Sequence, residues 1–103
     1  MIDYDIHVGD IGTIFEITVQ DAGVIMDISS ATLMEIKLRK PDGSVSVYNA
    51  THTTDGTDGK MRYIVIADTE IDQYGRWGIQ SRVVTPQGDW NSSIDTFDVA
   101  PNL

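Results

Sequence analysis

The chain has 103 residues and a formal net charge of −9, from 16 acidic and 7 basic side chains. This length suits one domain with a modest core, and the negative charge opposes binding to a nucleic-acid backbone, which needs clustered Lys and Arg. The absence of cysteine excludes disulfides and thiolate metal sites.

The apolar runs of the chain are too short for a helix that spans a bilayer, so no membrane partner is expected. Residues 1–5 lack the basic start and apolar stretch of a signal peptide, which predicts a protein made and kept in the cytosol. Of the acidic residues, 13 are Asp and 3 are Glu. Asp favours turns and strand ends whereas Glu favours helices, so this bias predicts an all-β chain.

In the first half of the chain, apolar and polar residues alternate with a period of two between turn residues, which is typical of strands. The expected strands are residues 2–8, 13–20, a short edge piece at 24–28, 33–40 and 44–51. Residues 41–44 predict a hairpin, because Pro41 presets φ and Gly43 accepts a positive φ.

The second half continues the same pattern. The expected strands are residues 61–67, 76–85 and 90–99, and residues 53–60 are expected to form a loop. The step from Ile94 to Phe97 breaks the period of two and predicts a bulge. A single helical turn fits only at residues 68–74, because no longer segment shows a helical period.

The segment from Ile71 to Ile79 is the most informative part of this half. A turn with Asp72 and Gly75 leads into a strand that places Trp77 and Ile79 on one side. Immunoglobulin-type sandwiches enter their strand F in this way, with an aromatic residue at the corner. We therefore predict an immunoglobulin-like antiparallel β-sandwich of seven to eight strands, a single domain over residues 1–103, with Trp77 in its core.

Metal and cofactor sites are not predicted. The Gly-rich loop at residues 55–59 contains two Asp residues, but it lacks the bidentate Glu and further oxygen ligands of the usual calcium loop, so a mobile turn is favoured. His7 and His52 lie on the polar faces of different strands and are interpreted as surface histidines, because a zinc site needs further converging ligands.

Catalytic residues are not predicted either. Glycoside hydrolysis needs two carboxylates facing each other across a cleft. Asp3 and Asp5 share one face of an edge-like strand, and Asp95 and Asp98 are a second pair without a predicted cleft. We interpret such pairs as solvated acidic surface and expect a non-enzymatic protein.

The strand at residues 61–67 is apolar on both faces, with Tyr63 and Val65 on one and Ile64 and Ile66 on the other. One face of a two-layer sandwich normally meets water. The second apolar face must therefore be covered by a loop, a neighbouring subunit or a partner, and we hypothesise an interface here.

Aromatic residues near turns are the other candidates for binding. Trp90 opens the last strand, and Tyr48 and Tyr74 lie near loops. Exposed Trp and Tyr stack on sugars or anchor protein interfaces, although Trp90 could equally belong to the core. The candidate interface residues are Tyr48, Tyr63, Ile64, Val65, Ile66 and Trp90.

Several short motifs follow one another in a set order. They are Gly9-Asp10, Phe15–Val19, Asp21–Gly23, Asp27–Ser30, Ile36–Gly43, Gly59-Lys60, Tyr63, Ile71-Asp72, Gly75–Trp77 and Phe97–Val99. Together they resemble the immunoglobulin-like domain of bacteriophage baseplate upper proteins and related tail and fibre components, over about Gly9 to Pro101.

The resemblance implies a β-sandwich that is a building block of the virion and attaches receptor-binding parts to the tail, without catalytic residues or cofactors. It also implies other virion proteins as partners, a symmetric or multi-copy assembly, and a location in the virion after synthesis in the host cytoplasm. No coiled coil or receptor-binding region follows before Leu103, which suggests a stand-alone structural or adaptor protein. The alternatives are a capsid decoration protein and a carbohydrate-binding module on the virion surface.

Overall fold

The computed structural model describes residues 6–102, and within this range the chain forms strands, turns and loops without a helix. The all-β prediction is therefore confirmed. It follows that residues 6–102 contain no apolar helix able to cross a bilayer. The strands in this range are β1 (Ile6–His7), β2 (Ile14–Thr18), β3 (Gln20–Asp21), β4 (Val24–Ile25), β5 (Leu33–Arg39), β6 (Val45–Asn49), β7 (Thr51–His52), β8 (Lys60–Ile64), β9 (Gly75–Thr85), β10 (Gly88–Asn91) and β11 (Asp95–Ala100). Residues 2–5 of the first expected strand lie outside the described range.

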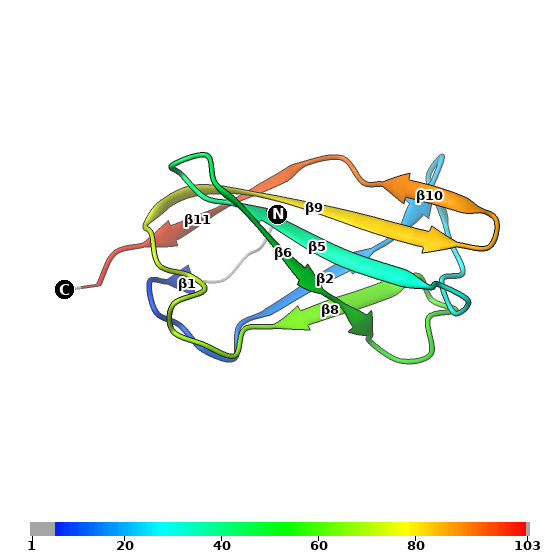
Figure 1. The fold of residues 1–103 in the computed structure, drawn as a ribbon, viewed down its shortest axis with the longest axis horizontal. Helices are drawn as coiled ribbons and strands as arrows, with labels where there is room; N and C mark the ends of the chain where they lie inside the picture. Colours follow the sequence, from blue (N-terminus) through cyan, green and yellow to red (C-terminus); the bar gives the residue numbers. More distant parts are fainter. Residues whose placement is uncertain (1–5, 103) are drawn as a thin grey trace.

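The long strand β9 organises the largest sheet, in which the strand order is β1-β11-β9-β5-β6 (Figure 1). Strand β5 pairs with β9 along one side. On the other side, β11 pairs with the first half of β9 and β10 with the second half. These pairings are antiparallel, whereas β1 runs parallel to β11.

A second sheet has the order β2-β8-β7, and β3 and β4 form a separate hairpin. The turn of this hairpin has two residues, Ala22 and Gly23, both with positive φ, as a type I′ turn requires. Strands β6 and β7 are almost continuous, so the chain passes across the buried Ala50 from the edge of the large sheet to the edge of the second. The large sheet is curled like half a barrel.

Alternate side chains of both sheets meet in one hydrophobic cluster. The ring of Phe15 on β2 lies 5.2 Å from that of Phe97 on β11, and Phe97 lies 5.9 Å from Trp77 on β9, measured between ring centroids. Trp77 is 1% exposed, which confirms its predicted place in the core. Full burial of each large apolar side chain contributes roughly 1.5–3 kcal/mol to folding.

The predicted bulge is present but lies earlier than expected. Asn91 pairs with Arg82, and Asp95 pairs with Ile79, so residues 92–94 face only residues 80–81. One extra residue is therefore inserted before Asp95, not between Ile94 and Phe97. The Ser92 hydroxyl accepts a hydrogen bond from the backbone N–H of Ser81 at 2.9 Å and stabilises the break.

Two other local expectations were wrong. The strand expected at residues 61–67 begins at Lys60 and ends at Ile64. The helical turn expected at residues 68–74 is replaced by a hydrogen-bonded turn from Ala67 to Glu70. The Glu70 carboxylate accepts hydrogen bonds from the backbone N–H groups of Ile66 and Ala67 and so closes this turn.

Candidate interaction surface

Four isoleucines form an exposed patch on the outside of the β2-β8 sheet. We call Ile11, Ile14, Ile64 and Ile66 the isoleucine surface. Ile14 and Ile64 are directly paired across the two strands, and Ile11 and Ile66 are the most exposed members, at 63% and 76%.

The strand alternation explains why these side chains point outward. Phe15 pairs with Tyr63, and both side chains turn towards the core, so Ile14 and Ile64 point the other way. The pairing continues beyond β8, because the Val65 N–H donates to the Thr13 carbonyl at 2.9 Å and the Gly12 N–H to the Val65 carbonyl at 2.8 Å. This continuation brings Ile66 beside residues 11 and 12.

Sequence reasoning grouped Ile64 with Ile66 on one face, and both are exposed. Val65 is 1% exposed, so it belongs to the core and is not available to a partner. Ile11 and Ile14 were missed. The sequence could have indicated that Ile14 is exposed, because along the strand it falls on the same face as the polar residues Glu16 and Thr18 and on the opposite face from Phe15.

Tyr48 and Tyr63 connect the two sheets. Their rings stack with centroids 4.5 Å apart, Tyr48 on β6 and Tyr63 on β8, and both are half-buried. The Tyr63 hydroxyl donates to the Glu70 carboxylate. Burial, and next this carboxylate, raise the pKa of the Tyr63 hydroxyl above its usual value. The two tyrosines therefore support the sheet packing behind the isoleucine surface.

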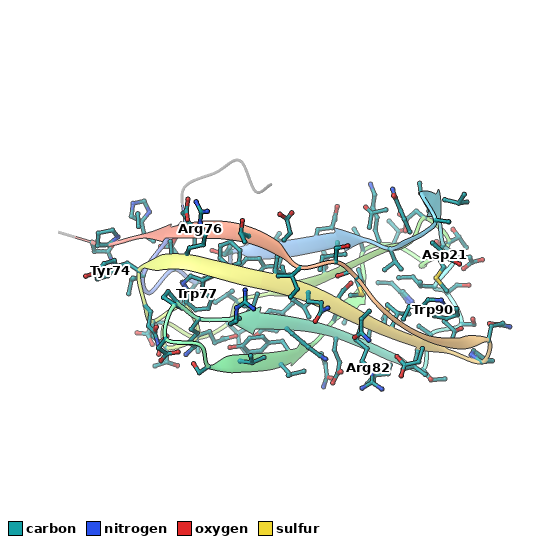
Figure 2. The ribbon with its side chains drawn as sticks, turned by 90° about the horizontal axis from the view of Figure 1, so that it is seen from above. Asp21, Tyr74, Arg76, Trp77, Arg82 and Trp90 are labelled. Carbon is teal, nitrogen blue, oxygen red and sulfur yellow. The ribbon has the colours of Figure 1, made fainter. Side chains whose placement is uncertain are left out.

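Trp90 is half-buried on the inward side of the large sheet, where it pairs with the buried Val83. Its ring packs over Gly88, at which a Cβ atom would lie 3.0 Å from the ring. Trp90 and the exposed Tyr74 lie at opposite ends of a molecule 46 Å long (Figure 2). Trp90, Tyr74 and the stacked Tyr48 therefore do not form one platform for a sugar.

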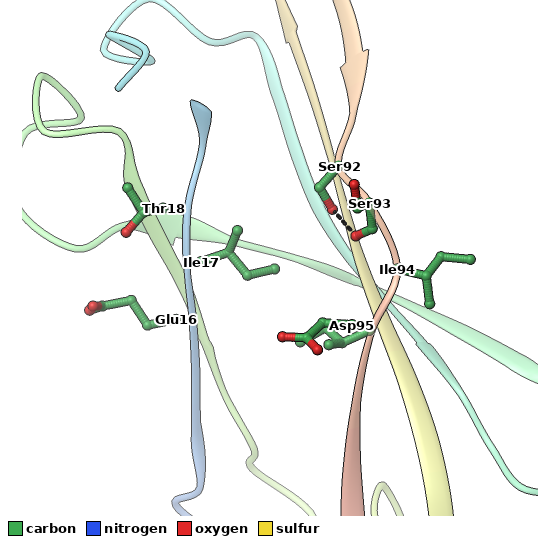
Figure 3. A pocket seen from close by; sticks show the side chains of 8 residues that line it. Glu16, Ile17, Thr18, Ser92, Ser93, Ile94 and Asp95 are labelled. Carbon is green, nitrogen blue, oxygen red and sulfur yellow. Dashed lines mark hydrogen bonds between the residues drawn. The ribbon is translucent and has the colours of Figure 1, made fainter. Parts of the chain in front are cut away.

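A groove of about 550 Å³ separates β2 from the bulge at residues 92–94 (Figure 3). The Ser92 hydroxyl in this groove donates to the Ser93 carbonyl at 2.9 Å, in addition to accepting from the backbone. The Glu16 carboxylate points away from Asp95 and accepts from the Thr53 hydroxyl at 3.2 Å. These side chains are arranged to stabilise loops and do not converge on a common point as paired carboxylates would.

The residues considered as metal ligands are held by local hydrogen bonds. Asp55 accepts from the backbone N–H and hydroxyl of Thr57, at 3.0 and 2.7 Å, and these bonds lower the pKa of its carboxyl group. Asp58 accepts from the Lys60 N–H at 3.0 Å. Among residues 6–102, no three His, Asp or Glu side chains are placed together to hold a metal ion.

The two histidines are half-buried, which corrects the expectation of surface histidines. His52 Nε2 lies 2.8 Å from the Ile28 carbonyl oxygen, so its ring connects β7 to the segment after β4. Of the acidic pair in β11, Asp98 accepts from the Arg76 guanidinium at 3.2 Å, and both Asp95 and Asp98 are exposed.

Comparisons of the chain with protein-family models, with curated proteins and with solved structures gave no match. Function is therefore inferred from the fold, from the exposed surfaces and from the order of the sequence motifs.

Proposed function

We propose that the chain is a non-enzymatic structural protein of a bacteriophage particle, a tail, baseplate or fibre-adaptor component that packs against other virion proteins through the isoleucine surface. The observation that carries the proposal is the clustering of four exposed isoleucines on one sheet face. Single exposed apolar residues are normal on soluble proteins, whereas a contiguous apolar patch is typical of an interaction site.

We also propose that the fold is an immunoglobulin-like sandwich, and the strand order supports this. In that fold, strands B, E and D share one sheet, and C, F and G share the other. The sheet β2-β8-β7 would supply B, E and D, and the large sheet would supply C as β5, F as β9, and G as β10 with β11. Strand β6 extends the second of these sheets at its open edge, as in variable-type domains.

The corner at the start of β9 adds support. The Trp77 indole N–H donates to the Gln73 carbonyl, four residues upstream, at 3.0 Å. In immunoglobulin domains a tyrosine hydroxyl makes the corresponding bond, two residues before a cysteine. Here Trp77 would replace that tyrosine, and the buried Ile79 would stand in the place of the cysteine.

The expected strength of the surface fits a multi-copy assembly. Burial of one large apolar side chain is worth roughly 1.5–3 kcal/mol when complete, and association costs at least about 4 kcal/mol of lost freedom. The isoleucine surface alone would therefore give weak binding. Repetition of the contact around a symmetric particle raises the effective concentration and makes the assembly stable.

The test compares Ile66→Glu with Val24→Glu, a matched control because Val24 is 69% exposed on the separate β3-β4 hairpin. Wild type and both variants are supplied as tagged chains during phage assembly, and purified particles are analysed by mass spectrometry and immunogold electron microscopy. We expect wild type and Val24→Glu in the particles, labelled at the tail, and Ile66→Glu excluded. Label on the head would favour the decoration alternative, and absence of wild type from particles would refute a virion role.

A further inference from the structure

Gly78 is a glycine in the middle of the longest strand, β9, where no turn requires it. Of the nine glycines, seven have a positive φ, and only Gly78 and Gly88 do not. Gly88 follows a turn and lies under the Trp90 ring. A glycine inside a strand weakens the strand, and it often marks a place where a ligand or another chain approaches closely. Gly78 is therefore a candidate for such a place.

The guanidinium group of Arg39 lies flat over Gly78. The two residues are directly paired across β5 and β9. A Cβ atom at residue 78 would lie 3.1 Å from Nη2 of Arg39 and 3.4 Å from both Cζ and Nε. Three atoms of a planar group at nearly equal distances show that its face, and not its edge, covers the glycine. The missing side chain thus allows this group to lie against the sheet.

The N–H donors of this guanidinium have no acceptor within residues 6–102. Three other basic residues, Lys40, Arg76 and Arg82, each make a salt bridge with an acidic side chain. The Arg39 side chain makes no salt bridge or hydrogen bond with any residue of the described range. The planar fork of an arginine matches the two oxygens of a carboxylate. A carboxylate is therefore the ligand group that the Arg39 side chain fits best.

A hollow of about 280 Å³ opens beside this guanidinium on the outer face of the large sheet. Its apolar walls include Val45 and Ile94, which are 56% and 54% exposed. The Gln80 side chain, which also lines the hollow, is fixed because its amide N–H donates to the Ser92 carbonyl at 2.9 Å. A few polar groups beside apolar walls are typical of a small-molecule site.

Lys37 is a second basic residue that lines the hollow. Its charge also acts on the Asp89 carboxylate, whose pKa is lowered first by the hydrogen bond from Arg82 and to a smaller extent by Lys37. Lys37 is therefore partly neutralised, and Arg39 is the principal group for an anion.

We propose that this hollow binds a single carboxylate carried on an aliphatic stem. The Arg39 guanidinium donates hydrogen bonds to the carboxylate oxygens, and Val45 and Ile94 contact the stem. One charge suits the site better than an acidic segment with several, because the net charge of −9 repels a strongly acidic partner. The attraction of Arg39 for one carboxylate acts within the Debye length of about 8 Å.

A free aliphatic acid and the C-terminus of a peptide both present this chemistry, and the ligands tested below distinguish them. The site lies on the sheet opposite the isoleucine surface, so it is independent of that surface and of a virion role.

The first test is an NMR titration of the purified chain with sodium hexanoate at constant ionic strength. We expect shifts of the backbone amides at residues 37–39, 78–80, 45 and 94, with a dissociation constant that is roughly millimolar for so small a ligand. Hexanamide, which lacks the charge, should bind at least about tenfold more weakly, and acetate, which lacks the stem, should bind about tenfold more weakly. Hexanamide that binds as well as hexanoate would overturn the proposal.

N-acetyl-leucine represents the C-terminus of a peptide. Tighter binding of N-acetyl-leucine than of hexanoate would assign the site to a peptide end, and the reverse order would assign it to a free acid. Absence of localised shifts with both ligands would overturn the proposal.

The second test uses variants. Arg39→Gln should weaken hexanoate binding at least about tenfold, whereas Arg76→Gln, at an exposed arginine on the same face that is already paired with Asp98, should bind like wild type. Gly78→Ala should weaken binding about fivefold or more, because the new Cβ displaces the guanidinium. Its melting temperature should stay the same or rise, because alanine suits a strand better than glycine does. Gly78→Ala that binds like wild type, or an equal loss in Arg76→Gln and Arg39→Gln, would overturn the proposal.

Discussion

The Glu70 carboxylate stabilises the turn after β8 through three hydrogen bonds, and we predict that Glu70→Ala destabilises the fold. The carboxylate accepts from the Tyr63 hydroxyl and from the backbone N–H groups of Ile66, at 3.0 Å, and Ala67, at 2.6 Å. Hydrogen bonds to a charged partner contribute about 1.5–3 kcal/mol each. Water can replace the bond to the exposed Ile66, so the half-buried Tyr63 and Ala67 carry most of the loss.

We therefore expect Glu70→Ala to lower the free energy of unfolding by about 2–4 kcal/mol, a large share of the 5–15 kcal/mol of a typical domain. For a chain of this length the melting temperature would fall by about 10–25 °C. The assay is urea unfolding of Glu70→Ala, Tyr63→Phe and the double variant, which gives the Tyr63–Glu70 coupling energy. Glu16→Ala, at an exposed Glu with one side-chain contact, should cost less than about 0.5 kcal/mol. A cost for Glu70→Ala as small as this, or zero coupling to Tyr63, would refute the reasoning.

Three further predictions concern the core, a loop and the hairpin. Trp77→Ala should lower the free energy of unfolding by about 3–5 kcal/mol, and Trp77→Phe should lower it less, because it keeps a ring and loses only the indole N–H. Both effects are measured by urea unfolding. A stable Trp77→Ala variant would contradict the assignment of Trp77 to the corner. Gly56→Ala should lower the free energy of unfolding by about 1–3 kcal/mol, because φ at Gly56 is +88° and the new Cβ would lie 2.7 Å from the His52 ring. Gly43→Ala is the control. Gly43 has φ +91° and open space around it, so thermal melts of this variant should show only the cost of the strained backbone. The Asp42 carboxyl, hydrogen-bonded first by the Ser44 hydroxyl, has its pKa lowered to about 2. Its contribution to stability is thus present above the unfolded pKa of 3.8 and is lost as pH falls towards 2; an NMR titration of Asp42 should show this midpoint in wild type and a higher one in Ser44→Ala.

The elements that sequence alone predicted correctly are those fixed by local chemistry. The alternation along Leu33–Arg39 and the turn chemistry of Gly43 predict β5, its hairpin and β6 without knowledge of the rest. The all-β class followed from the same local patterns and from the excess of Asp over Glu.

What sequence missed depends on contacts between distant segments. At Ala50 the chain leaves the large sheet and joins the second sheet. This change depends on the pairing of β6 with β5 and of β7 with β8, and β5 and β8 are distant from one another in the sequence. The turn from Ala67 to Glu70 is held by the Glu70 carboxylate, which accepts from the Ala67 N–H and from the hydroxyl of Tyr63 on β8, a contact that no local pattern indicates. Alternation in the sequence separated Val65 from Ile64 and Ile66, but only the packing against β2 shows that Val65 lies on the buried face and Ile66 on the exposed one.

The parallel pairing of β1 with β11 determines how the molecule would respond to mechanical force. Ile6 pairs with Val99 and His7 with Ala100, and the Val8 N–H bonds to the Ala100 carbonyl at 3.1 Å. Tension applied between the chain before Ile6 and the chain after Ala100 would pull these parallel strands in opposite directions. Their hydrogen bonds would then be loaded together in shear and would not open one after another. This ladder is only two residue pairs long, whereas the ladder between β11 and β9 has five pairs. Under tension β1 would therefore separate from β11 before β11 separates from β9.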